Sequence, residues 1–305
     1  MILHHWDSDG ICSAALLMRM QREENFTPKI GNYFLDNDDI EKLKGYDEIR
    51  VVDMNLPDAA KICEFARLWI YDHHMATKVE CAQEHCNPSL YGESYPSATL
   101  VIMERFNLPF DHIVALGIVG DNGPKTKELK EYKLIKNLEK NGITFDDLQK
   151  AVNLIDSSYK INDRKEVIKN VELVLDGIEA ILENEKLNRN VELIEKEIEK
   201  WAGKAEKTGK ICTLKMKTNY NIISAVTRKI VWENGGTALV LNHKDDRDEI
   251  YLRSTEMDVT QYIKIAKSRK YFAGGKKEVM GAILPKGEGA KFFEEILKKI
   301  DEQHP

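Results

Sequence analysis

The chain of 305 residues has few cysteines and no long apolar segment. Because no run of about 18 or more apolar residues occurs, we expect no membrane-spanning helix. Five cysteines, an odd number in a long chain, do not resemble a disulfide framework and predict reduced thiols. The apolar start at Met1 leaves no room for a signal peptide, so we expect a cytoplasmic protein.

Internal repeats and low-complexity tracts are also absent from the sequence. Hydrophobic residues make up 42% and charged residues 31%, which predicts a globular protein large enough for two ordinary domains. The net charge of -6 argues against an unspecific nucleic-acid coat. From residue 206 onward, however, 19 Lys and Arg stand against 14 Asp and Glu. This mildly basic part fits a phosphate-binding surface, although a chance difference between solvated faces explains it equally well.

Short apolar runs alternate with amphipathic stretches up to about residue 122. We expect strands at 2–5, 29–35, 49–53 and 68–71, and helices at 11–22, 38–43, 58–66 and 97–106. Such alternation predicts an α/β fold, in which a parallel sheet carries helices on both faces. Ligands of such sheets bind beyond the carboxyl ends of the strands.

The rest of the sequence predicts a helical connector and a second, smaller α/β domain. Residues 125–205 have the spacing of amphipathic helices. Strands are expected at 211–216, 237–241, 249–253 and 279–284, with helices at 259–266 and 291–300 and a glycine turn at 272–275. We therefore predict domains at 1–205, connector included, and at 206–305.

Four polar clusters follow the predicted strands and one apolar helix. In the first, His5, Asp7 and Asp9 alternate along the chain, so an extended backbone would direct them to one side. Mixed imidazole and carboxylate ligands suit a borderline divalent ion such as manganese. The others are Asp53, the run Asp72-His73-His74, and Asp121.

Each cluster alone has an ordinary explanation, as a strand end, an exposed loop or a helix stop. Together they predict a two-metal site, in which the ions share a water, lower its pKa and stabilise the reacting oxygens of a phosphate. His74 would face the substrate, and Asp72 would fix an imidazole tautomer. The candidate metal ligands are His5, Asp7, Asp9, Asp53, His73 and Asp121.

The order of these clusters resembles motifs I to IV of the DHH phosphoesterase superfamily. That superfamily includes RecJ exonucleases, nanoRNases, cyclic-dinucleotide phosphodiesterases, exopolyphosphatases and family II pyrophosphatases. The resemblance implies that His5 and Asp7 bind one manganese ion, and that Asp9, His73 and Asp121 bind the other. It further implies that Asp53 bridges the ions and that His74 contacts the scissile phosphate. We choose His5 over His4 because His5 alternates with the two aspartates.

The C-terminal part resembles the DHHA1 substrate-binding domain of the nuclease branch. Tyr251-Leu252-Arg253-Ser254 is similar to the Arg-Ser strand end of that family, whose arginine binds nucleic-acid phosphate. Residues 273–281 lie where the family has a Gly-Gly-Gly-His turn, but Ala273 and Lys276 replace the first glycine and the histidine. A lysine can hold a phosphate but shuttles a proton less easily. The implied substrate-binding residues are Arg253, Ser254, Gly274, Gly275 and Lys276.

The resemblance implies a manganese-dependent phosphodiesterase, with Mg²⁺ or Co²⁺ as substitute ions. Single-stranded DNA or RNA, or short oligonucleotides, would be hydrolysed from an end by water that two ions activate. One alternative is a small-substrate enzyme acting on pyrophosphate, polyphosphate or a cyclic dinucleotide. A second is a non-catalytic, replication-associated binding protein. The sequence leaves the oligomeric state open, with a homodimer as one alternative, and we expect no membrane partner.

Overall fold

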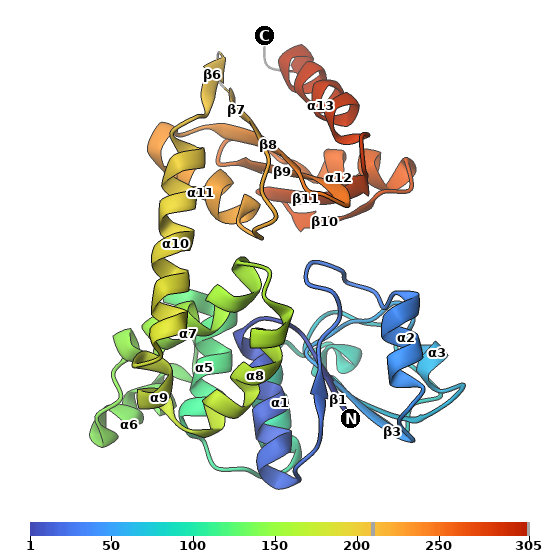
Figure 1. Ribbon diagram of the computed structural model, residues 1–305, viewed down its shortest axis with the longest axis vertical. Helices are drawn as coiled ribbons and strands as arrows, with labels where there is room; N and C mark the ends of the chain where they lie inside the picture. Colours follow the sequence, from blue (N-terminus) through green and yellow to red (C-terminus); the bar gives the residue numbers. More distant parts are fainter. Residues whose placement is uncertain (209–210, 304–305) are drawn as a thin grey trace. The chain divides into compact units, whose positions relative to one another are not determined.

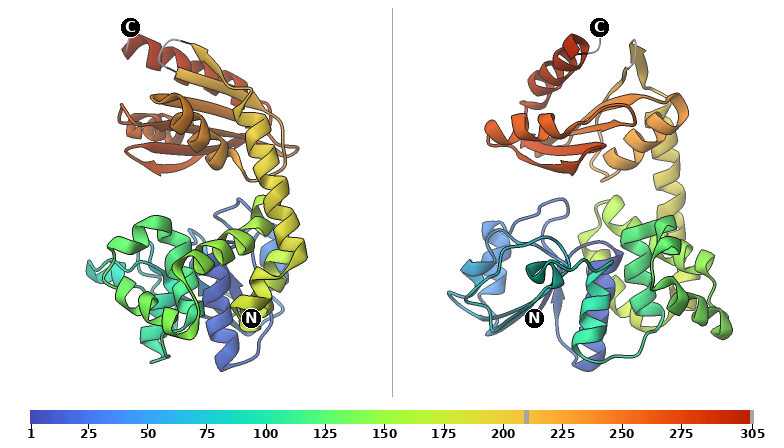
Figure 2. Two further views of the ribbon diagram at one scale, coloured as in Figure 1. Left: turned by 90° about the vertical axis from the view of Figure 1, so that its left-hand side faces the viewer. Right: turned by 180° about the vertical axis from the view of Figure 1, so that it is seen from behind.

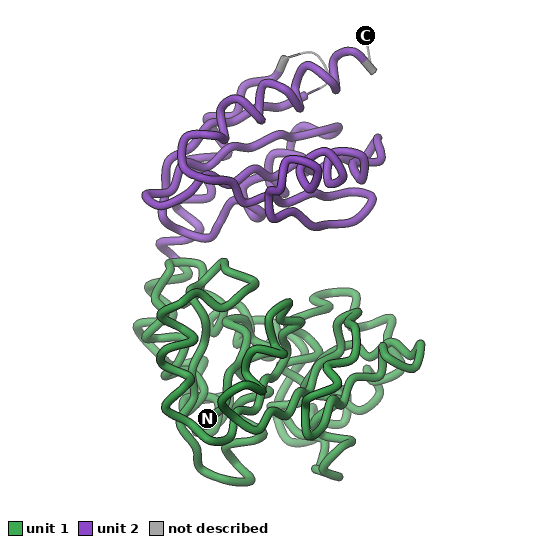
Figure 3. The backbone as a smooth tube through the Cα atoms, turned by 90° about the vertical axis from the view of Figure 1, so that its right-hand side faces the viewer, with its two compact units in different colours: residues 1–191 green, residues 192–305 purple. Residues whose placement is uncertain are grey.

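The computed structural model describes residues 1–208 and 211–303 and divides into two compact units, residues 1–191 and 192–305 (Figure 3). The division falls inside α10 (Glu185–Ala202), which is one continuous helix (Figure 2). The predicted domain boundary at 205/206 stays a prediction, because compactness does not decide to which domain the connecting helix belongs.

The first unit is built on a five-stranded sheet of order β2-β1-β3-β4-β5. Strands β1 and β3 of this sheet are labelled in Figure 1. Every neighbouring pair is parallel, which confirms the predicted parallel sheet. Parallel pairing brings the carboxyl ends of the strands to one edge. The strands are β1 (Ile2–His4), β2 (Asn25–Phe26), β3 (Glu48–Val52), β4 (Arg67–Tyr71) and β5 (Glu84–Cys86).

Helices cover both faces of this sheet, as predicted. Alternate strand residues are buried in different clusters, because successive side chains point to opposite faces. Val52 and Tyr71 pack with the helices of one face, whereas Val51 and Ile70 pack with those of the other. The first face carries α1 (Ser8–Met20), α4 (Ala98–Arg105) and α5 (His112–Asn122), and the second carries α2 (Asn37–Leu43) and α3 (Ala59–Ile62).

Two edge strands differ from the sequence prediction. The predicted strand at 29–35 does not form in this described stretch, where Gly31 has a φ of 85° that interrupts an extended backbone. The short β2 pairs with β1 instead. We also missed β5, because Glu84-His85-Cys86 has no apolar alternation that would distinguish it from a loop.

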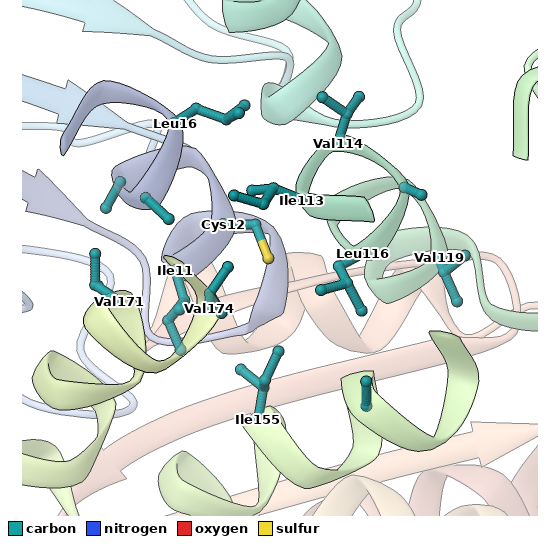
Figure 4. Packing of buried hydrophobic residues seen from close by; sticks show 14 of the residues in the cluster. Ile11, Cys12, Leu16, Ile113, Val114, Leu116, Val119, Ile155, Val171 and Val174 are labelled. Carbon is teal, nitrogen blue, oxygen red and sulfur yellow. The ribbon is translucent and has the colours of Figure 1, made fainter. Parts of the chain in front are cut away.

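The helical region after residue 122 is more than a connector. Ile155 of α7 and Val171 and Val174 of α8 pack against α1 and α5 in one core (Figure 4). These helices therefore hold the two helices that begin or end beside the polar clusters. The region contains η2 (Gly123–Glu128), α6 (Tyr132–Leu138), η3 (Glu139–Asn141), α7 (Phe145–Lys160), α8 (Arg164–Leu175) and α9 (Ile178–Leu182); a further short helix, η1 (Pro88–Tyr91), precedes α4.

The second unit has a six-stranded sheet of order β10-β11-β9-β8-β7-β6. Only β7 and β8 pair in parallel among its described strands. The predicted strands at 237–241 and 249–253 form and pair as an antiparallel hairpin, but residues 272–275 belong to strand β10 and the turn lies at 277–278. The elements are β6 (Glu206–Thr208), β7 (Ile211–Met216), α11 (Ile223–Asn234), β8 (Thr237–His243), β9 (Arg247–Ser254), α12 (Thr260–Ser268), β10 (Phe272–Lys276), β11 (Val279–Pro285) and α13 (Gly289–Gln303).

The cysteines do not all carry free thiols. Cys63 and Cys81 form a disulfide, so the prediction of reduced thiols is wrong for this pair. Their spacing in sequence gives no sign of it, because the fold brings α3 beside the loop between β4 and β5. Cys12, Cys86 and Cys212 are free. In the described part of the chain, no helix has the length and apolar character needed to cross a membrane.

Candidate metal centre

The turn from β1 into α1 places three of the predicted ligands. His5 follows β1, and Asp7 is the N-cap of α1, where its side chain accepts a hydrogen bond from the Gly10 N–H at 3.2 Å. Asp9 lies in the first helical turn. The expected strand alternation is therefore wrong for Asp9, because the helix starts at Ser8 and the helical turn carries this carboxylate into the site.

His4 and His5 have different surroundings. His4 is fully buried, its Nε2 lies 3.1 Å from Asn25 Oδ1, and burial lowers its pKa to about 4. His5 Nδ1 lies 2.7 Å from Asp7 Oδ2 and 3.6 Å from Asp53 Oδ2. The structure thus places His5, and not His4, among the carboxylates.

Asp53 lies between two groups of potential ligands. Its Oδ2 faces His5, while its Oδ1 lies 3.5 Å from His73 Nε2. The residue is 1% exposed and has a φ of 56°, a left-handed conformation that aspartate tolerates better than most residues. A hydrogen bond from its backbone N–H to Tyr71 O fixes it to the adjacent strand.

His73 joins segments that are distant in the sequence. Its Nε2 lies 3.0 Å from Asp121 Oδ2, at the end of α5, and 3.8 Å from Asp9 Oδ2. Its Nδ1 lies 3.0 Å from the Tyr95 carbonyl oxygen, which assigns the proton to Nδ1. Nε2 is therefore the ring nitrogen that faces the carboxylates and would coordinate a metal ion.

Asp72 orients the second histidine. Its Oδ1 accepts hydrogen bonds from the His73 N–H at 2.8 Å and the His74 N–H at 3.3 Å, and from His74 Nδ1 at 2.8 Å. Burial acts to raise the pKa of Asp72, but the hydrogen bonds from His74 and the charges of both histidines together outweigh burial and lower it. The His74 side chain is 48% exposed, so its ring is available at the margin of the buried cluster.

The N-terminus of α4 cradles Asp9, a feature that our sequence analysis missed. The backbone N–H groups of Ala98 and Thr99 donate to its two carboxylate oxygens at 2.6 and 3.1 Å. Gly117 of α5 lies on the other side, where an added Cβ would come within 2.4 Å of Asp9 Oδ1. The helix predicted at 97–106 locates this helix start, and Ser97 caps it, but only the packing of α4 against α1 aims it at Asp9.

A second missed residue is Asp156 of α7. This partly buried carboxylate accepts a hydrogen bond from the Ser8 N–H at 2.9 Å, and desolvation raises its pKa to about 6. It therefore fixes the start of α1 between Asp7 and Asp9. The region had been interpreted as scaffold, and nothing in its sequence distinguishes Asp156 from the solvated charges around it.

Burial and the crowding of carboxylates raise several pKa values in the site, so its groups hold protons more tightly. Burial, with Asp121 nearby, raises the pKa of Asp9 to about 7, and burial with Asp9 raises that of Asp53 well above its ordinary value. Burial acts to lower the pKa of His73, but its contacts with Asp121 and Asp53 outweigh this and raise it to about 12. A divalent cation would offset the repulsion that these shifts reflect.

The arrangement of the ligand atoms suits metal coordination better than direct hydrogen bonds among them. His5 Nδ1, both Asp53 oxygens and His73 Nε2 are buried and lie close to groups of opposite charge, but none of these contacts has hydrogen-bond geometry in the described residues. The ligand atoms within each of three groups lie within 4.8 Å of one another. The groups are His5, Asp7 and Asp53; Asp9, His73 and Asp121; and Asp53, His73 and His74. Their mixed nitrogen and oxygen donors suit manganese, with Asp53 common to two groups.

The predicted substrate residues lie at the end of the second sheet, and they have different environments. Val279 pairs with Arg253 on one side and with Lys276 on the other, so the three side chains share one face. Gly274 and Gly275 are exposed in β10, and an added Cβ on Gly275 would meet Val279 O at 2.1 Å. Ser254 is buried, and its hydroxyl accepts from the Glu256 and Met257 N–H groups, which stabilises a turn.

Comparison with known proteins gives one family and several similar folds. Residues 1–146 match the model of the DHH family, N-terminal domain. No curated protein matched the chain. A DHH-domain protein described as a member of the s1p family of ribosomal proteins has a TM-score of 0.72 at 16% identity, over 98% of this chain and 85% of that one.

Two further solved structures share the fold. The exonuclease RecJ bound to manganese gives a TM-score of 0.67 at 17% identity, over 100% of this chain and 90% of RecJ. The pGpG-specific phosphodiesterase PggH from Vibrio cholerae gives 0.57 at 14% identity, over 99% and 98%. At these identities the structures show a common fold alone. The family match covers the part that holds every candidate metal ligand, so we conclude that residues 1–146 form a domain of the DHH family, whose members are metal-dependent phosphoesterases.

Proposed function

We propose that this phosphoesterase hydrolyses single-stranded nucleic acid or short oligonucleotides from an end. The observation that carries the proposal is the meeting of Asp53 with two ligand groups beside the half-exposed His74. The exonuclease RecJ and the pGpG-specific phosphodiesterase PggH, which share this fold, support a nucleotide-containing phosphodiester as substrate.

We assign manganese to two positions in this centre. His5, Asp7 and Asp53 would hold one ion, and Asp9, His73 and Asp121 the other. Asp53 Oδ1 lies 3.5 Å from His73 Nε2, so this carboxylate would serve both ions. When bound, such a pair of ions supplies an activated water and neutralises charge on the phosphate oxygens. The N–H groups of α4 already satisfy part of the charge of Asp9, so they also fix the direction of its carboxylate.

His74 is the residue that we assign to the substrate phosphate. Its Nδ1 is held by Asp72, which leaves Nε2 as the atom that can reach a ligand. A protonated His74 would donate from Nε2 to a phosphate oxygen, and the Asp72 carboxylate would stabilise the resulting imidazolium. The same pair would set the orientation of the scissile group before the reaction.

The second unit would supply contacts to the phosphate backbone. Arg253 and Lys276 lie in one row of the sheet, and Gly274 and Gly275 leave the neighbouring backbone open to a close approach. Arg253 Nε is buried without a partner in the described residues, so a phosphate would satisfy a donor that the fold leaves unused. Ser254 would contribute indirectly, because its hydroxyl stabilises the turn that follows β9.

End-labelled single-stranded DNA and RNA of several lengths, incubated with manganese, test the proposal. We expect mononucleotides to appear from the first time points, with progressive shortening from one end. Parallel reactions with pyrophosphate, polyphosphate and a cyclic dinucleotide test the alternative substrates. Phosphate released from pyrophosphate, without mononucleotides from any oligonucleotide, would replace our assignment by a small-substrate phosphatase. Metal binding without hydrolysis of any of these would indicate a binding protein.

A further inference from the structure

We propose that the Cys63–Cys81 disulfide is a thiol-exchange site that controls the chain segment following the His73-His74 pair. Cys63 follows α3, and Cys81 lies in the loop between β4 and β5, with their Cα atoms 6.1 Å apart. The bond closes a covalent loop that contains β4 and both histidines. It therefore joins the segment after Asp53 to the segment after His74.

A pocket of about 860 Å³ lies between these two segments, lined by residues of 54–60 on one side and 75–81 on the other. The outer wall, 75–81, is fixed at both ends and once between them, where the Val79 N–H donates to His85 Nδ1 at 3.1 Å. Near the metal centre, the Asn55 side chain donates to the Met75 carbonyl oxygen at 2.7 Å. At the far end, the disulfide fixes Cys81. Asp72, which orients His74, lines the same pocket.

The two histidines do not depend on the disulfide for their positions. The His74 carbonyl oxygen accepts from Asn87 Nδ2 and from Ser89 Oγ, both at 2.8 Å. His73 is held by Tyr95 and by Asp72, as described above. Breaking the disulfide should therefore loosen the pocket wall while the metal ligands stay in place.

The exposure of the two sulfur-bearing residues defines the exchange reaction. Cys81 is exposed and Cys63 is half-buried, so an incoming thiolate attacks the Cys81 sulfur. This attack forms a mixed disulfide and releases Cys63 as a thiolate, which takes up a proton. The second thiol of a dithiol reductant then displaces Cys81. Two electrons pass from the dithiol, which becomes a disulfide, to two protein thiols.

The consequence for catalysis rests on the proposed function. A fixed wall beside His74 requires little further ordering when an oligonucleotide binds, whereas a loosened wall loses conformational entropy on binding. Reduction should therefore raise KM about threefold to tenfold and leave kcat and the manganese affinity nearly unchanged.

Hydrogen exchange of the full chain, before and after dithiothreitol, tests the tether without any substrate. We expect faster exchange of the amides at 75–82 after reduction, with unchanged exchange in α4 and α5. Cys63→Ser and Cys81→Ser should exchange like the reduced protein, whether or not dithiothreitol is present. Cys86→Ser is the matched control, because Cys86 is a free, half-buried thiol near the same loop, and it should respond to dithiothreitol as the native protein does.

Five thiols in the untreated protein, or identical exchange in both redox states, would overturn the tether. An unchanged KM alongside altered exchange would overturn its effect on substrate binding. If the oxidised protein hydrolyses no oligonucleotide, the proposed function fails, and the exchange measurement still decides the tether. The reduced native protein gives the same comparison if either serine variant does not fold.

Discussion

His73 Nε2 lies 3.0 Å from Asp121 Oδ2, although the histidine follows a strand and the aspartate ends a helix on one face of the sheet. The Nδ1–H of His73 donates a hydrogen bond to the Tyr95 carbonyl oxygen, so Nε2 is directed into the carboxylate cluster. This contact joins the sheet edge to the end of α5 and makes that helix part of the centre.

Removal of the Asp53 carboxylate charge should abolish hydrolysis. Asp53→Asn keeps a side chain that tolerates the φ of 56°, so it tests charge and not backbone strain. We expect kcat at saturating manganese to fall by about 10³-fold or more, because both ligand groups lose their common member. Asp38→Asn, at an exposed position in α2, is the control. Activity within twofold of native for Asp53→Asn would remove Asp53 from the centre.

Substitution at Gly117 should disturb the site through Asp9. In Gly117→Ala the Cβ would lie 2.4 Å from Asp9 Oδ1 and 2.2 Å from Thr99 Oγ1, so the carboxylate or α4 must shift. We expect manganese affinity, measured by calorimetry, to fall about 10–100-fold. Gly45→Ala, whose Cβ would have only an ordinary contact at 3.5 Å, should bind manganese like the native protein.

Substitutions of His4 and of His5 should have effects that appear in different assays. His5→Ala should lower manganese affinity about 10–100-fold with little loss of folding free energy. His4→Ala should instead cost about 1–3 kcal/mol in the free energy of unfolding, because it leaves Asn25 without its buried partner. Denaturant unfolding and metal titration of both variants separate these effects, and the reverse pattern would assign the ligand to His4.

The metal-free protein should lose stability as pH rises from 7 to 9. The folded-state pKa of His73, about 12, exceeds its ordinary value of 6.5, so between pH 7 and 9 the native state holds a proton that the unfolded chain has released. Asp9, whose folded-state pKa is about 7, contributes in the same direction below pH 7. Stability must then fall with rising pH in this window. Thermal melts in a chelating buffer should show the decline, and manganese should reverse it. A melting temperature that rises with pH without metal would contradict these shifts.

Arg253 should act on binding and not on turnover. Arg253→Ala should raise KM for an oligonucleotide about tenfold, leave kcat nearly unchanged and reduce the salt dependence by about one phosphate contact. Lys276→Ala should have the smaller effect, because Lys276 is exposed in β10 while Arg253 is partly buried. Equal losses of kcat in both variants would instead indicate that these residues take part in the catalytic step.

The sequence alone determined the chemical composition of the centre and the architecture around it. Strand–helix alternation predicts the parallel sheet, and parallel strands bring Asp53 and the Asp72-His73-His74 run to one edge whatever the details of packing. It also determined that His5, Asp7 and Asp9 lie near a helix start, although the alternation argument gave the wrong route for Asp9.

Only the tertiary structure decided which partners hold these residues, because those contacts join segments that no local pattern relates. The α4 amides reach Asp9, and Asp156 reaches the start of α1, through helix packing that depends on the whole core. The Cys63–Cys81 bond likewise requires α3 to lie beside the β4–β5 loop. Periodicity reports the face that a residue occupies, whereas the neighbour across that face is set by the packing of distant segments.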